Sequence, residues 1–250
     1  MVKGESSVLQ AALWGAAAGS AVLIGAAIGL YVRMSRLVLG FIMAYGTGVL
    51  IGAASFELLN EAVSEGGLWI TARYFISGAV IFTAANAIIA KKGGGERKKS
   101  KRNRPSGQSG LAILIGTVMD AIPESLIIGV SLLEGSQVSL LMVLAIFISN
   151  FPEGMSSSTG FLQDGYSRGK ILGLWIVVFL LSALSSWGGY VLLRDASDVV
   201  ISAISAFAAG GMIAMTSSTM MPEAYEEGGP TVGLVTAAGL LSALLLTAME

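Results

Sequence analysis

Eight stretches of apolar sequence, each long enough to cross a bilayer as a helix, constrain the fold of this chain more than any other feature. A transmembrane helix needs about 20 consecutive, mostly apolar residues. Of the 250 residues, 54% are hydrophobic and only 12% are charged, whereas about a quarter of the residues in soluble domains are charged. We therefore predict an all-α, polytopic membrane protein that forms one domain over residues 1–250 and has the lipid bilayer as its partner. The expected spans are 7–32, 37–59, 67–90, 110–132, 138–162, 171–193, 199–222 and 231–249.

The one long connection, residues 91–109, joins the third and fourth spans and holds eight Lys or Arg residues. Its polar, glycine-containing composition is typical of a flexible linker. A nucleic-acid-binding arm would also be basic, but the usual excess of positive charge on cytoplasmic loops explains this loop without a nucleic-acid partner. If the loop is cytoplasmic, twelve of the fifteen basic residues lie inside, including Arg33, Arg36, Arg168 and Lys170. We expect a multi-pass protein of the cell membrane with both termini outside.

Residues 44–62 align without gaps to residues 206–224, with six identical positions at a spacing of 162 residues. The expected second span runs outward and the seventh runs inward, so the repeat is inverted, as in many alternating-access transporters. This pattern predicts eight helices in a 3+2+3 arrangement. The repeat also places Glu61 near the outer end of one span and Glu223 near the inner end of the other, with Glu57 one turn deeper than Glu61. We regard these three glutamates as candidate pathway residues. Alternatively, alanine- and glycine-rich helices align by chance, and Glu61 and Glu223 are solvated helix-end charges.

Two predicted helices each carry a Pro-Glu step near the middle of an apolar span, at Pro123-Glu124 and at Pro152-Glu153. An acidic residue at the centre of a membrane helix costs about 2.5–3.5 kcal/mol. Asp120, Glu124 and Glu153 together would cost about 8–10 kcal/mol if they faced lipid. These carboxylates are therefore expected to face protein, water or a bound cation.

The spacing of the polar residues brings them to one face of each helix. Asp120 and Glu124 are four residues apart, and Ser149 and Asn150 precede Glu153 by four and three residues. Each proline also leaves the carbonyl four residues earlier, at Met119 and at Ile148, without its helical donor. The expected result is a cage of oxygen ligands for a divalent cation. The alternative is a kinked helix pair in which buried, protonated acids hydrogen-bond to each other. The candidate metal ligands are Asp120, Glu124, Ser149, Asn150 and Glu153.

The segments Asp120-Ala121-Ile122-Pro123-Glu124-Ser125 and Ser149-Asn150-Phe151-Pro152-Glu153-Gly154 resemble the metal-binding motifs of the ZIP family of divalent-metal transporters. The resemblance spans the whole chain. It implies eight transmembrane helices, both termini outside, a variable loop after the third helix, and a homodimer. It further implies transport of zinc, manganese, iron or a similar cation, with the metal as substrate and no cofactor.

By that resemblance, Glu124 and Glu153 match the bridging carboxylates of the family's metal centre. Asp120 stands where the family has its first histidine, Ser149 stands at the counterpart on the fifth helix, and Asn150 matches its motif position. Ala121 supplies no ligand, and the sixth span carries no carboxylate, so a single metal at Asp120, Glu124 and Glu153 is expected. An oxygen-only site suits manganese or magnesium, but zinc also accepts carboxylates. The metal therefore stays open.

Two other classes of function were weighed. The chain has no His and no Cys, which excludes Ser-His dyads and His-ligated zinc proteases. An intramembrane aspartyl protease needs two aspartates within spans, and only Asp120 qualifies. We therefore expect no enzyme. The remaining alternative is a transport-inactive, ZIP-like metal sensor or scaffold.

Overall fold

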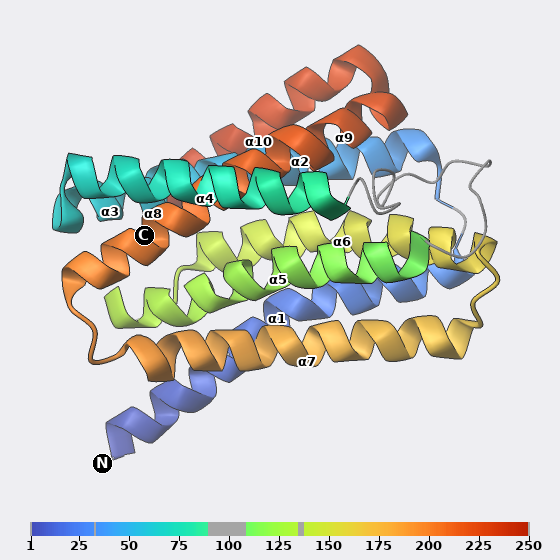
Figure 1. Ribbon diagram of the computed structural model, residues 1–250. Coiled ribbons are helices and arrows are strands. Elements are labelled where there is room, and N and C mark those ends of the chain that lie inside the picture. Colours follow the sequence, from blue (N-terminus) through green and yellow to red (C-terminus); the bar gives the residue numbers. More distant parts are fainter. Residues whose placement is uncertain (1, 33, 90–108, 135–137, 250) are drawn as a thin grey trace.

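The computed structural model describes residues 2–32, 34–89, 109–134 and 138–249, and every element in these ranges is helical (Figure 1). The predicted basic loop 91–109 lies outside the described residues except at Ser109, and Arg33 lies outside them too. The first half comprises α1 (Val2–Tyr31), α2 (Arg36–Ala53), η1 (Ala54–Leu59), α3 (Asn60–Gly66), α4 (Leu68–Ile89) and α5 (Ser109–Glu134). The second half comprises α6 (Leu140–Gln163), α7 (Arg168–Leu193), α8 (Asp198–Met215), η3 (Thr216–Met220), α9 (Met221–Gly228), η4 (Gly229–Thr231) and α10 (Val232–Thr247).

Serine caps begin several of these helices. The side chains of Ser35, Ser139 and Ser167 each accept a hydrogen bond from the backbone N–H three residues later. Such a cap satisfies one of the donors that the first helical turn leaves without a partner. The starts of α2, α6 and α7 are therefore determined by local sequence.

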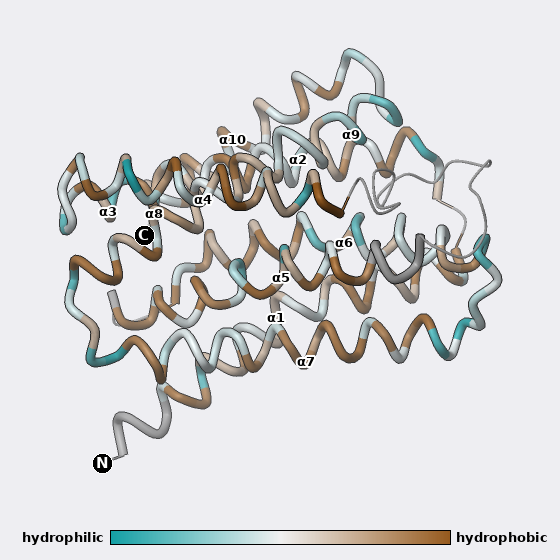
Figure 2. The backbone as a smooth tube through the Cα atoms, viewed as in Figure 1, coloured by the Kyte–Doolittle hydropathy of each residue, from teal (hydrophilic) through white to brown (hydrophobic). Residues whose placement is uncertain are grey.

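Seven helical stretches of the described chain are long and apolar enough to cross a membrane. The predicted count of eight is not confirmed, because the expected seventh and eighth spans fall within one continuous helical stretch, Asp198–Thr247. That stretch contains a change of direction at Gly229, whose φ is +70°. Apolar segments run along the long helices, and hydrophilic residues lie near helix ends and also within α5 and α6 (Figure 2).

The bounds of the elements follow the 162-residue spacing of the sequence repeat. α2 begins at Arg36 and α8 at Asp198, and the π-helices η1 and η3 begin at Ala54 and Thr216. The glycines with positive φ that follow, at 67 and 229, keep the same spacing. The correspondence therefore extends beyond the aligned residues 44–62 and 206–224, to element type and turn conformation.

The helices pack in two groups (Figure 1). In the first group, α1 packs on α6 and α7, and α5 packs on α7; in the second, α2 packs on α10 and on α9, and α4 packs on α8. Along α1, the motif Gly15-x-x-x-Gly19 lies against Ser182 and Ser186 of α7, and Gly25-x-x-x-Gly29 lies against Phe151 and Met155 of α6. Small residues allow membrane helices to approach this closely. α1 thus packs closely on α7 through its first small-residue motif and on α6 through its second.

The largest buried cluster lies where the two groups meet and joins residues of α2, α5, α6 and α8. In contrast, only 6% of the apolar window of α4 is buried, and Trp69 at its start is 75% exposed. An apolar outer surface of this kind is expected of a helix that faces lipid. The polar residues of α5 and α6 therefore lie inside the bundle, between the two helix groups.

Candidate metal centre

The five predicted metal ligands are all buried, although their helices are otherwise apolar. Their exposed fractions are 2–5%, and they are Asp120 and Glu124 of α5 with Ser149, Asn150 and Glu153 of α6. Both helices continue through their internal prolines, Pro123 and Pro152. Burial of an ionised carboxylate is costly unless hydrogen bonds or a cation stabilise it.

Glu153 is linked to the facing helix by a hydrogen bond. The Thr117 hydroxyl of α5 donates to Glu153 Oε1 over 3.0 Å, and both side chains are buried. Thr117 was missed in the sequence analysis, although it lies three residues before Asp120 and seven before Glu124. That spacing puts all three on one face of α5. Thr117 therefore belongs to the polar face that meets Glu153.

Ser149 directs its hydroxyl toward its own helix, where it donates to the Ile146 carbonyl over 3.0 Å. This is the usual bond of a buried serine within a membrane helix. In this conformation the Ser149 hydroxyl proton is thus directed at the backbone, and its oxygen keeps a lone pair for a further contact.

Asp120 and Glu124 also line a pocket between α5 and the pair α4 and α8. The α4 side contributes Gly78 and Phe82, and the α8 side contributes Gly211 and Met215. Apart from the two acids, the residues lining this pocket are apolar or glycine. The two carboxylates of α5 therefore lie at the boundary between the two helix groups.

Within the described ranges, no group of three or more His, Cys, Asp or Glu residues is arranged so that it could hold a metal ion. A metal bound among these helices in this conformation would therefore need other oxygen donors as well. The neighbouring hydroxyl and amide side chains are Thr117, Ser149 and Asn150. Hard divalent cations accept such mixed oxygen ligands.

The candidate pathway residues occupy three different environments. Glu57, in η1, is half-buried, and its Oε2 accepts a hydrogen bond from the hydroxyl of Ser139 at the start of α6. Glu61, in α3, is half-buried. Glu223, in α9, is only 4% exposed, and its Oε1 accepts a hydrogen bond from Ser156 of α6 over 3.0 Å. The alternative of a solvated helix-end charge is therefore wrong for Glu223.

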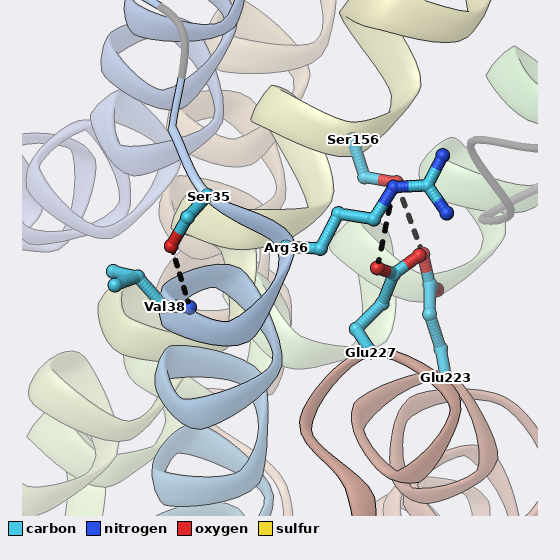
Figure 3. A network of polar contacts seen from close by, with 6 residues as sticks. All are labelled: Ser35, Arg36, Val38, Ser156, Glu223 and Glu227. Carbon is cyan, nitrogen blue, oxygen red and sulfur yellow. Dashed lines mark hydrogen bonds and ion pairs between the residues drawn. The ribbon is translucent and has the colours of Figure 1, made fainter.

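A basic residue of α2 lies beside the carboxylate of Glu227 on α9 (Figure 3). Arg36 Nε lies 3.8 Å from Oε2 of Glu227, one helical turn beyond Glu223. We call Arg36, Ser156, Glu223 and Glu227 the α2/α9 cluster. From sequence, Arg36 is identified only as a topological charge, and Ser156 and Glu227 are not among the candidate residues. The spacing of the two glutamates on α9 could have indicated a shared face.

Comparison with known proteins gives two matches. A protein named "putative zinc transporter", from Arabidopsis thaliana, is 27% identical over 230 residues. The match covers 90% of this chain but only 36% of that relative, so this chain spans about a third of the relative's length. A sequence model of the ZIP zinc transporter family matches residues 84–247, which is more than half of the chain. The chain therefore belongs to the ZIP zinc transporter family, whose members are transporters and not enzymes.

Proposed function

We propose that this chain carries a divalent metal ion across the cell membrane through the buried acids of α5 and α6. The observation that carries the proposal is the burial of Asp120, Glu124 and Glu153 on two proline-containing helices of a membrane bundle. Acidic residues inside a membrane protein are costly and usually mark an ion pathway. Oxygen donors suit manganese and magnesium, and zinc also accepts them.

The proposed mechanism is alternating access by a 3+2+3 inverted repeat with eight membrane crossings. Three observations support it. The starts of α2 and η1 and the end of α3 recur in α8, η3 and α9 at a spacing of 162 residues. The third helix of each half packs on the other half, since α10 packs on α2 and α4 packs on α8. Finally, α10 leaves the turn at Gly229 and runs beside α2, where the Tyr45 hydroxyl donates to Ser242 over 2.9 Å.

Hydrogen bonds from α6 to two glutamates would change during such a cycle. Ser139, at the start of α6, donates to Glu57, and Ser156, in its second half, donates to Glu223. One bond thus joins the start of α6 to η1, and the other joins the second half of α6 to α9. These two segments belong to the two halves of the repeat. We propose that opening of the pathway on one side breaks the bond on that side.

Metal uptake by the purified chain in proteoliposomes tests this function, with Zn²⁺, Mn²⁺ and Fe²⁺ supplied separately. Glu124→Gln keeps the size of the side chain and removes its charge, so uptake should fall at least about tenfold because a shared ligand is lost. The matched control is Asp195→Asn, which also converts an acid to its amide; the side chain of Asp195 is 89% exposed after the end of α7, and uptake by this variant should equal that of the parent.

Parental uptake by Glu124→Gln would contradict the assignment of this ligand. Metal binding without uptake by the parent would instead support the sensor or scaffold. Light scattering of the purified chain tests the homodimer that we propose from the family resemblance. Cysteine-labelling from the two sides tests the proposed orientation, with both termini outside.

A further inference from the structure

The α2/α9 cluster contains an ion pair with very unequal exposure. The side chain of Arg36 is 66% exposed, whereas that of its partner Glu227 is 9% exposed. Arg36 follows directly after the N-cap Ser35, whose hydroxyl accepts from the Val38 N–H (Figure 3). The carboxylate is therefore held in the protein, while the guanidinium reaches it from the surface and has room to leave.

A second carboxylate lies one turn away on the same helix face. Glu223 and Glu227 are four residues apart on α9, and Glu223 is held by Ser156 of α6. Like charges at this spacing repel each other. A cation beside either carboxylate lowers this repulsion, and Arg36 lies beside Glu227.

The related half of the chain shows that helix packing does not require a base at this position. On one side, Gly40 of α2 lies against Gly228 of α9; on the other, Ser202 of α8 lies against Gly66 of α3. Gly40 and Ser202 are 162 residues apart, and so are Gly66 and Gly228. The two contacts therefore correspond to each other in the repeat. The packing is thus repeated.

The charges at the neighbouring positions are not repeated. The position of Arg36 is occupied by Asp198 in the other half, and that of Glu227 by Glu65. An acid such as Asp198 suits the first turn of a helix, whereas a base there is opposed by the helix dipole. Neither packing nor helix electrostatics therefore requires Arg36. A base on this side of the membrane agrees with the excess of positive charge on cytoplasmic loops, and Arg36 additionally contacts Glu227.

We propose that Arg36 is a tethered cation that competes with the transported metal for the carboxylates of Glu223 and Glu227. The inference rests on the proposed function in one respect, namely that metal passes Glu223. A metal reaching the cluster meets a carboxylate of Glu227 that is already paired with Arg36, so the metal is held less tightly and leaves more readily. At the equivalent positions of the other half, Asp198 replaces the base and Glu65 keeps the acid, so the tethered cation belongs to one end of the pathway.

The test is Mn²⁺ binding to the full chain in detergent, measured from the loss of the free Mn²⁺ signal in electron paramagnetic resonance. The Glu124→Gln background weakens the central site, so that the cluster is observed separately. Arg36→Gln should tighten Mn²⁺ binding about tenfold, because a positive charge a few ångströms from the metal is removed. Arg36→Lys keeps the charge and should bind as the parent does.

The matched control is Arg168→Gln. Arg168 is also the first residue of a helix behind a serine cap, but it lies 5.1 Å from the ring of Tyr31 and has no part in the cluster. Mn²⁺ affinity should not change in this variant. Adding Glu227→Gln to Arg36→Gln should abolish the gain in affinity, since a carboxylate that the metal would use is lost.

Equal Mn²⁺ affinity in Arg36→Gln and Arg168→Gln would overturn the proposal. If Arg36→Gln does not fold, Arg36→Asp replaces it, because the related half carries Asp198 in the same packing environment. Arg36→Asp should also bind Mn²⁺ more tightly than the parent. Parental affinity in this variant would overturn the proposal. Binding in detergent requires no transport, so the two proposals can fail separately. A chain whose Mn²⁺ affinity depends on Arg36 but that takes up no metal would refute the proposed transport function and leave the competition by Arg36 standing.

Discussion

At the scale of single residues, three carboxylates of this bundle each accept a hydrogen bond from a hydroxyl group. Glu153 meets Thr117, Glu57 meets Ser139 and Glu223 meets Ser156. A hydrogen bond to a charged group contributes about 1.5–3 kcal/mol, which is comparable to the cost of an acid in a membrane helix. A hydroxyl can also rotate and turn its lone pairs toward an incoming metal. These serine and threonine side chains are therefore suited to hold a carboxylate between metal-binding events.

The choice of metal is also expected to depend on single residues. Asp120→His should shift the preference of the chain toward zinc over manganese, because imidazole is a softer donor than a carboxylate. We expect the ratio of zinc to manganese affinity to rise about tenfold or more. Competition between the two metals in binding or uptake measures it. An unchanged ratio would mean that Asp120 does not contact the metal.

At the scale of elements, the long helices that carry Glu57 and Glu223 are interrupted in the same way. In each, an α-helix leads into a π-helix, a further short helix and a glycine with positive φ. π-helical turns are rare, widen the backbone locally and often occur at functional sites. Glu57 lies within η1, and Glu223 follows η3 by three residues. The two π-helices therefore introduce an irregularity next to each of these candidate pathway residues.

The two turn glycines should be far more sensitive to substitution than glycines elsewhere on the surface. Gly67 has φ 77° and ψ 158°, and Gly229 has φ 70° and ψ −162°, a region that only glycine enters easily. Gly67→Ala and Gly229→Ala should each lower the free energy of unfolding by about 1–3 kcal/mol through backbone strain. No atom lies within 4 Å of the added Cβ, so no clash contributes.

Gly173→Ala is the control for this pair, since Gly173 lies in α7 and its Cβ would also meet open space. This substitution should be neutral or stabilise the helix by up to about 1 kcal/mol. Thermal unfolding in detergent measures all three variants. Equal losses for the turn glycines and Gly173 would show that the turns relax without strain.

At the scale of the whole molecule, the two helix groups meet at the largest buried cluster and at the pocket beside Asp120 and Glu124. A change in the relative position of the groups would open one end of this boundary and close the other. That motion is the rocking expected of transporters with inverted repeats.

Labelling at repeat-related positions tests this motion. The chain has no native cysteine, so Glu57→Cys and Thr219→Cys give single, clean labelling sites; both positions are half-buried. Metal, or any condition that favours one state, should raise the rate of thiol labelling at one position and lower it at the other. Rates that change in the same direction would indicate a continuous pore or a static fold. The control is Val63→Cys, on an exposed part of α3, where the rate should not change.

Much of this architecture was predictable because membrane insertion imposes strong local rules. The length and composition of the apolar stretches predicted an all-helical membrane protein, and the cost of a charge in lipid predicted the burial of Asp120, Glu124 and Glu153. The count of eight spans was not confirmed, since Asp198–Thr247 forms one helical stretch. The family resemblance was confirmed by the match to residues 84–247. The ligand role of the five central residues stays a prediction.

Tertiary structure alone decided which partner each polar side chain meets. Thr117 and Glu153 are 36 residues apart, and Ser139 and Glu57 are 82 residues apart; the pairing of Arg36 with Glu227 is longer still in sequence. In a soluble helix, an apolar stripe reveals the buried face. In a membrane helix, the lipid-facing side is as apolar as the buried side: in α10, Leu234 is 79% exposed and Ala243 is fully buried, and both are hydrophobic. Local sequence therefore determines where these helices lie in depth, whereas their rotation and crossing, and with them the carboxylate–hydroxyl contacts, follow only from packing among all the helices.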